Sequence, residues 1–222
     1  AGVAKGGIGA IVWSGLGKTV AAIVLSPATG FALALVLILV VSWLFVRQTP
    51  FAVDNTFRIL QFVSASLYSL GHGGNDAQKT MGIIAVLLYS QGHLGTEFSI
   101  PFWVVLSCQA AMALGTLMGG WRIVRTMGLR ITKLTPMQGF CAETGGAATL
   151  FMATFLGVPV STTHTITGAI VGVGAARRVS AGRWNVASSI VYAWVITIPA
   201  SAIVAALNFW AGHALRLSGD NI

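Results

Sequence analysis

The stretch TVAAIVLSPATGFALALVLILVVSWLFV, from Thr19 to Val46, decides the fold class because it contains no charged residue. A helix needs about 20 apolar residues to cross the hydrocarbon core of a bilayer. Over the 222 residues, hydrophobic side chains make up 55% and charged ones only 8%. A soluble domain has about 25% charged residues. The chain is therefore predicted to be an integral membrane protein.

Further apolar segments follow this first one, which Ser26 and Pro27 are expected to interrupt. They are Ile59–Ser90 with a polar break at Gly71–Thr80, Ile100–Trp121, Met137–Leu156, Thr162–Ala176 after Pro159, and Val186–Ala211 with Pro199. A bilayer offers no water to unpaired backbone groups, so these segments are predicted to be helices. The expected fold is all-α, a polytopic transmembrane helix bundle with broken or re-entrant helices.

The basic residues predict the orientation of these helices, because cytoplasmic loops carry an excess of Lys and Arg. Two clusters lie between apolar segments: Arg122, Arg125, Arg130 and Lys133, and Arg177, Arg178 and Arg183. Both are expected to be cytoplasmic. The linker Gln91–Ser99 has no Lys or Arg and is expected outside, as are Ala1–Trp13 and the C-terminus.

The formal net charge of +8 does not indicate a nucleic-acid partner, because the basic residues sit in loops rather than on a basic face of a soluble fold. The two cysteines, Cys108 and Cys141, lie inside apolar runs. Their positions favour neither a zinc site nor a disulfide framework.

A weak internal similarity relates Gly2–Trp13 to Gly172–Trp184. An odd number of predicted crossings separates the two copies, so they would have opposite orientations. Inverted repeats are typical of secondary transporters. We expect one transmembrane domain over 1–222, with 1–46 ending a first repeat and 59–212 forming a second.

The polar motif SLGHGGNDAQKT, residues 69–80, interrupts an apolar segment. Its glycines are expected to let the backbone unwind. Asn75 or Asp76 would then cap a helix running to Ser90, whose free N–H groups form an anion site. The Asp76 carboxylate suits Na⁺ or a proton, and Lys79 would offset Asp76 or touch an anion.

The second motif, GVPVSTTHT, covers residues 157–165. Pro159 is expected to end one helix and Ser161 to cap the next. The hydroxyls of Ser161, Thr162 and Thr163 would converge with the first-turn N–H groups. Such neutral donors are able to hold a tetrahedral oxyanion.

A lone carboxylate, Glu143, precedes Thr144 inside the fourth segment. Carboxylates at membrane depth are costly and usually functional, so Glu143 and Asp76 are expected in the transport path, with Na⁺ as a candidate ligand of either. Plainer interpretations stay open for four other residues. Thr144, Thr167 and His72 could serve helix packing, and Lys79 could simply pair with Asp76.

The chain is not expected to be an enzyme. Ser161 and His164 lie three residues apart with no acid to orient the histidine, and the stretch Gly71–Thr80 lacks the GxxxxGK[ST] spacing of a phosphate-binding loop.

Taken in order, three motifs resemble the PiT family of inorganic phosphate transporters over nearly the whole chain: Gly73-Gly74-Asn75-Asp76-Ala77-Gln78-Lys79 with Gly82, Glu143-Thr144, and Pro159-Val160-Ser161-Thr162-Thr163-His164. The resemblance implies two inverted halves, each with one Asn-Asp and one Ser-Thr-Thr-His motif, which hold the substrate near mid-membrane. The substrate-binding candidates are Gly74, Asn75, Asp76, Lys79, Ser161, Thr162, Thr163 and His164. The cation-coupling candidates are Asn75, Asp76, Glu143 and Thr144.

The resulting hypothesis is a symporter that carries inorganic phosphate with Na⁺ or H⁺ by alternating access, without any other cofactor. Only one copy of each motif is present, so the chain is expected to be the C-terminal half of a multi-pass protein of the cell (inner or plasma) membrane. Its expected partners are phosphate, the coupling cation, lipid and the N-terminal half. A homo-oligomer is left open. The alternatives are a permease for sulfate or another oxyanion, or a non-transporting receptor or assembly subunit.

Overall fold

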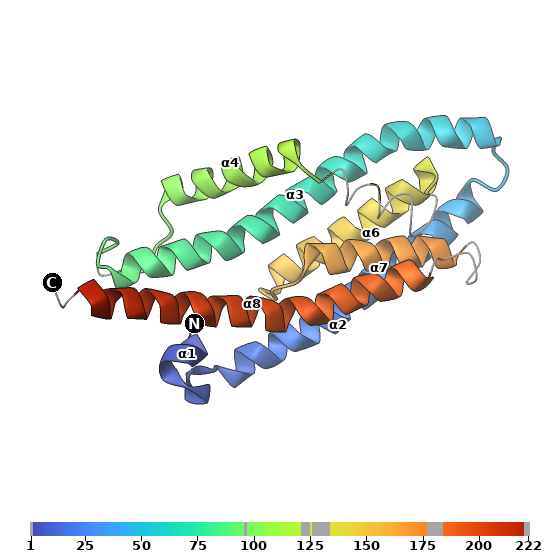
Figure 1. The fold of residues 1–222 in the computed structure, drawn as a ribbon. Coiled ribbons are helices and arrows are strands. Elements are labelled where there is room, and N and C mark those ends of the chain that lie inside the picture. Colours follow the sequence, from blue (N-terminus) through green and yellow to red (C-terminus); the bar gives the residue numbers. More distant parts are fainter. Residues whose placement is uncertain (1, 96, 121–124, 126–133, 177–183, 220–222) are drawn as a thin grey trace. The chain divides into compact units, whose positions relative to one another are not determined.

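The computed structural model describes residues 2–95, 97–120, 125, 134–176 and 184–219. Every regular element within these residues is helical, which confirms the all-α class. The elements are α1 (Gly2–Gly6), the short 3-10 helix η1 (Ile8–Ala10), α2 (Trp13–Leu44), α3 (Pro50–Ser90), α4 (Phe102–Met118), α6 (Pro136–Phe155), α7 (Thr162–Ala175) and α8 (Trp184–Gly219) (Figure 1). Each predicted apolar segment corresponds to one helix.

The chain divides into two compact units, Ala1–Lys18 with Arg183–Ile222, and Thr19–Gly182. In the first unit α1 contacts α8. Helix α8 contains Pro199 within its length. The stretch Val191–His213 of this helix is long and apolar enough to cross a membrane.

In the second unit, α6 packs against both α3 and α7, and α4 lies along the later part of α3 (Figure 1). Helices α3 and α6 run parallel, because contacts advance together along both. The ring of Phe57 meets Phe140 at 5.3 Å between centroids, and Gly71 lies beside Leu150. Helices α6 and α7 form a hairpin, so the chain turns back at the end of α6.

Helix α2 continues through Ser26 and Pro27, so the predicted interruption there is wrong. Its backbone lies against α7, where a Cβ atom added to Gly168 or Gly172 would overlap the Pro27 or Phe31 carbonyl. Small residues allow helices in membranes to approach this closely. The packing of α7 therefore supports α2 at the point where proline removes a backbone donor.

Helix α3 also continues through Gly71–Thr80, so the predicted unwinding of this stretch is wrong. Glycines in a helix interior cost about 1 kcal/mol each. Packing opposes that cost: Gly71 is buried against Leu150, and the fully buried Ala77 belongs to an apolar cluster with Val104 of α4. Asn75 and Asp76 consequently lie inside a helix and cap no helix start.

The break between α6 and α7 is where the sequence predicted it. Gly157 has φ 64°, a left-handed conformation that favours glycine. Pro159 follows, and the Ser161 side chain accepts a hydrogen bond from the backbone N–H of His164 at 3.4 Å. Local residue chemistry therefore ends α6 and starts α7.

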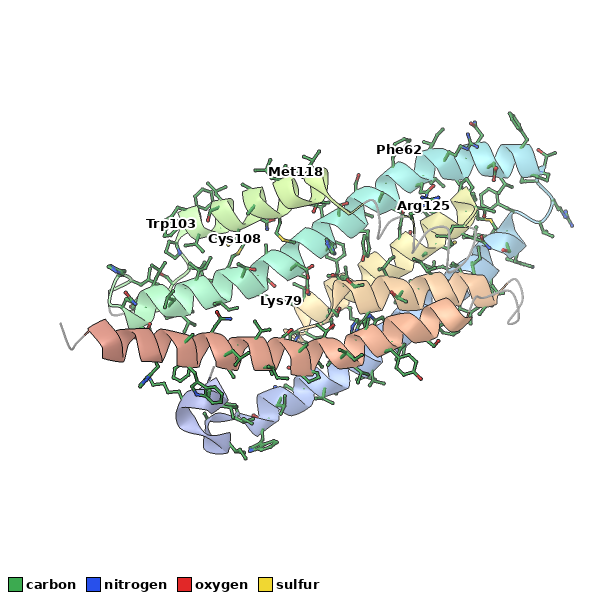
Figure 2. All side chains as sticks on the ribbon, viewed as in Figure 1. Phe62, Lys79, Trp103, Cys108, Met118 and Arg125 are labelled. Atoms are coloured by element: carbon green, nitrogen blue, oxygen red, sulfur yellow. The ribbon has the colours of Figure 1, made fainter. Side chains whose placement is uncertain are left out.

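Large apolar side chains cover the outer surfaces of the described helices. Examples are Trp43, Phe62, Trp103, Leu117 and Trp210, all more than half exposed; Figure 2 labels Phe62 and Trp103. Among the described residues, two helical stretches are long and apolar enough to span a bilayer: helix α2 and the stretch Val191–His213 of α8. Helix α4 is apolar but shorter. This surface suits lipid rather than water. Apart from Arg125, the basic residues used for the orientation lie outside the described residues.

Candidate functional site

The two motifs meet where the middle of α3 passes the start of α7. Asp76 of α3 accepts a hydrogen bond from the Thr162 hydroxyl at 3.2 Å on its Oδ2 atom. His72, one turn earlier on α3, places Nε2 at 3.7 Å from the same oxygen. Asp76 and Thr162 are 86 residues apart in sequence, so only the fold joins them.

Lys79 completes this junction from the next turn of α3. Its Nζ atom is 3.3 Å from Asp76 Oδ1 and donates to the backbone carbonyl of Val160 at 2.7 Å. Figure 2 labels Lys79 near the middle of the second unit, on the part of α3 that meets the α6–α7 break. Of the two roles predicted for Lys79, the structure shows the pairing with Asp76.

The three hydroxyls of the second motif do not converge at one point. The Ser161 side chain caps α7, the Thr162 hydroxyl points to Asp76, and Thr163 is exposed. In a helix, the side chains of consecutive residues point about 100° apart around the axis, and this separates the three hydroxyls. Thr162, only 3% exposed, is the residue of this motif whose hydroxyl reaches Asp76 of α3.

His164 of the same motif serves α2. Its side chain hydrogen-bonds the backbone of Ile23. Pro27 has no N–H, so the Ile23 carbonyl lacks its usual partner four residues later in the helix. His164 thus helps α2 to pass through Pro27, and it connects the start of α7 to a defect in a neighbouring helix.

Glu143 lies in a separate polar cluster on α6 and the earlier part of α3. The Ser64 hydroxyl donates to Glu143 Oε2 at 2.5 Å, and the Gln61 side chain is a further hydrogen-bond partner. Ser64 precedes Asp76 by 12 residues, or about 18 Å of helix at 1.5 Å per residue. Asp76 and Glu143 therefore do not share one ion site, and the described residues contain no cluster of three His, Cys, Asp or Glu side chains for a metal ion.

Tyr68 stands between the two carboxylates, and the sequence analysis missed it. Its hydroxyl donates to the Thr162 carbonyl at 3.2 Å, and its ring stacks on His72 with centroids 6.0 Å apart. Residues 68, 72 and 76 are spaced by four, which puts them on one face of a continuous helix. That spacing would have revealed Tyr68 if residues 69–80 had been taken as helical.

Several buried polar atoms near these clusters have no hydrogen-bond partner among the described residues. They are Asn75 Oδ1, Thr144 Oγ1 and His72 Nδ1. Such atoms are rare in folded proteins and mark places where a ligand, ion or water is expected. Asn75, which precedes Asp76 on α3, is 5% exposed. Gly74 has open space around it, because nothing lies within 4 Å of a Cβ atom added there.

The sequence and the fold of the chain are similar to those of known proteins. Residues 1–205 match the model of the phosphate transporter family. The chain is 76% identical over 211 residues to a Rhizobium meliloti (strain 1021) protein named "Probable low-affinity inorganic phosphate transporter", covering 95% of this chain and 63% of that one. A Bacillus subtilis (strain 168) protein of the same name is 41% identical over 210 residues, with the same coverage of both chains.

Among solved structures, one titled "The sodium-dependent phosphate transporter" is similar with a TM-score of 0.78. The match covers 89% of this chain and 66% of that chain at 23% sequence identity. At this level of sequence identity, the similarity shows that the two proteins share a fold. The chain spans slightly less than two thirds of the length of both curated relatives.

Proposed function

Because the chain belongs to the phosphate transporter family, we propose that it works as one part of a transporter that carries inorganic phosphate together with Na⁺ or H⁺. The chain is a membrane protein. Under this proposal it crosses the cell membrane several times, and a further part of the transporter supplies a second, inverted copy of the two motifs. The names of the relatives, which specify phosphate, support the substrate.

The observation that carries the proposal is the junction of Asp76, Lys79 and Thr162 at the break between α6 and α7. Irregular backbone is tolerated at membrane depth only where it is buried or lines a water-filled cavity, and transporters bind substrate at broken helices. The free N–H groups and positive dipole end of α7 favour an anion there. Ser161, Thr162 and Thr163 carry neutral hydroxyls at this end of α7, although these point in different directions, and Asn75 of α3 adds an amide; under this proposal, phosphate binding draws on these neutral groups.

The two acidic residues suit cation coupling better than contact with phosphate. An ionised carboxylate repels an anion, and a bound Na⁺ or proton removes this conflict. Asp76 has Asn75 beside it, whereas Glu143 has Ser64, Gln61 and the adjacent Thr144. We therefore propose Asp76 with Asn75, and Glu143 with Thr144, as two separate positions for the cation.

Phosphate uptake into proteoliposomes tests the function. The chain is reconstituted alone and together with the remaining part of the transporter, with an imposed Na⁺ or H⁺ gradient and with sulfate as competitor. We expect phosphate flux from the complete protein that depends on the gradient and withstands excess sulfate. Loss of phosphate flux to sulfate would favour a sulfate carrier, and no flux from the complete protein would favour a receptor or assembly subunit.

The substrate position is tested by Thr162→Ala in the complete protein. Under the proposal the Thr162 hydroxyl donates to bound phosphate, and losing a donor to a charged group costs about 1–3 kcal/mol, so the dissociation constant for phosphate should rise roughly tenfold to hundredfold. The matched control is Thr116→Ala on α4, because the Thr116 hydroxyl bonds only the preceding turn, at the Met112 carbonyl. Equal phosphate affinity of Thr162→Ala and Thr116→Ala would remove Thr162 from the substrate site.

A further inference from the structure

The Lys79 ammonium bridges two elements of the second unit. One of its acceptors, Asp76 Oδ1, belongs to α3, and the other, the Val160 carbonyl, belongs to the break that precedes α7. Val160 is 5% exposed, whereas the side chains of Asp76 and Lys79 are 28% and 45% exposed. The ammonium therefore reaches from the surface of α3 to a carbonyl in the packed interior.

These two oxygens are the type that holds a small hard cation. Carboxylates and backbone carbonyls are ligands of such ions, and non-helical carbonyls at helix breaks coordinate coupling cations in transporters. The second carboxylate oxygen of Asp76 is occupied by the Thr162 hydroxyl, with His72 Nε2 at 3.7 Å. Oδ1 is the Asp76 oxygen that, together with the Val160 carbonyl, contacts the lysine ammonium.

We propose that Lys79 is a tethered cation whose ammonium competes with a free monovalent cation for the position between Asp76 Oδ1 and the Val160 carbonyl. This inference rests on the proposed function, since it places Asp76 in the transport path. Competition lowers the affinity of this position for Na⁺. It also leaves the Glu143 cluster as the position that binds a free cation without a tethered competitor, because the described partners of Glu143 are Ser64 and Gln61 and include no lysine.

Displacement of Lys79 would also help phosphate to bind. While paired, Asp76 and Lys79 together carry no net charge, and two of the lysine donors are engaged. When a free cation takes the position, the ammonium becomes available to an anion at the start of α7. Cation and phosphate then favour each other's binding, and this coupling is reciprocal.

Binding of radioactive sodium ions to the purified protein in detergent tests the competition without any measurement of transport. Lys79→Gln removes the charge but keeps a donor for the Val160 carbonyl, and Lys79→Met removes both. We expect each variant to bind Na⁺ with a dissociation constant about twofold to fivefold lower than that of the wild type, a range appropriate for a partly exposed ion pair. Adding Asp76→Asn to Lys79→Gln should abolish the gain.

Lys18→Gln is the matched control, because it makes the same change in net charge in another part of the chain. It should bind Na⁺ as the wild type does. The proposal would be overturned if both Lys79 variants had the Na⁺ affinity of the wild type, or if neither variant bound Na⁺. It would also be overturned if the gain in affinity remained after Asp76→Asn was added. A wild type that binds Na⁺ but neither binds nor transports phosphate would instead count against the proposed function.

A second readout uses the complete protein. Na⁺ should raise the phosphate affinity of the wild type and should raise that of Lys79→Gln by a smaller factor, because no ammonium is left to be released. Equal factors in the two proteins would contradict the linkage between Lys79 and the anion. Circular dichroism and size-exclusion profiles confirm that each variant is folded before either comparison is made.

Discussion

At the scale of single residues, Gly168 shows how closely α7 approaches α2. A Cβ atom added there would overlap the backbone carbonyl of Pro27, and a backbone atom cannot move aside as a flexible side chain does. The contact also lies four residues after His164, which bonds the Ile23 backbone. Gly168 and His164 thus support the same stretch of α2, one by its small size and the other by a hydrogen bond.

Gly168→Ala is therefore expected to destabilise the second unit. Overpacking of a well-packed contact costs about 1–3 kcal/mol, whereas alanine at an open helical glycine gains about 0.5–1 kcal/mol. Gly82→Ala on α3 is the matched control, since nothing lies within 4 Å of its added Cβ atom. Thermal unfolding in detergent should give a lower midpoint for Gly168→Ala and an equal or higher one for Gly82→Ala. A midpoint of Gly168→Ala at or above the wild type would contradict the close approach.

At the scale of the elements, α3 holds the start of α7 from both sides of Ser161. Lys79 bonds the Val160 carbonyl, and Tyr68 bonds the Thr162 carbonyl. The Val160 carbonyl lies outside both helices, so the Lys79 bond satisfies a group that no helix pairs, whereas the Thr162 carbonyl lies in the first turn of α7 and accepts the Tyr68 hydroxyl as an additional bond. Because the donors come from one continuous helix, a shift of α3 along its axis would move the first turn of α7.

Tyr68→Phe tests this link. The ring, which packs against Gly146, is retained, and only the hydroxyl bond is lost, at a cost of about 0.5–1.5 kcal/mol. We expect a small change in the unfolding midpoint and a phosphate dissociation constant raised about twofold to tenfold, since the first turn of α7 is less firmly placed. Tyr89→Phe, at a half-exposed tyrosine, is the control. Wild-type phosphate affinity in Tyr68→Phe would show that its hydroxyl matters only for packing.

At the scale of the whole molecule, the prediction concerns the membrane sides of two loops. The segment Gln91–Ser99 carries no Lys or Arg, whereas the residues between α4 and α6 include Arg122, Arg125, Arg130 and Lys133. Cytoplasmic loops are enriched in such residues. A single crossing by α4 would then separate His93 outside from Arg125 inside, in agreement with the orientation predicted from the sequence.

Labelling with a membrane-impermeant thiol reagent tests these sides. His93→Cys should react in intact cells, and Arg125→Cys should react only after the membrane is opened. Both positions are exposed, and the native Cys108 and Cys141 are buried, so the background is expected to be low. Reaction of both introduced cysteines from the outside would show that α4 does not cross the membrane, and the inverted-repeat hypothesis would lose its topological basis.

The sequence by itself determined the features that depend on composition and short-range chemistry. An apolar composition with few charges indicates lipid as the solvent, and helices are the way such segments pair their backbone groups. The break between α6 and α7 was likewise predictable, because Gly157, Pro159 and Ser161 act on the backbone within a few residues of themselves. Asp76 and Glu143 stood out because carboxylates are rare in such segments.

Only the tertiary structure decided that α3 runs unbroken through Gly71–Thr80 and which groups meet along it. Local propensity disfavours helix at adjacent glycines by about 1 kcal/mol each, but burial against α6 and α4 opposes that preference. Once α3 is continuous, its four-residue spacing sets Tyr68, His72 and Asp76 in line. Lys79 meets Val160 81 residues further along the chain, and Ser64 meets Glu143 across 79 residues. Such contacts form when helices that are far apart in the sequence pack together. Helix propensity, capping and the spacing within a motif depend only on nearby residues, so they do not predict these contacts.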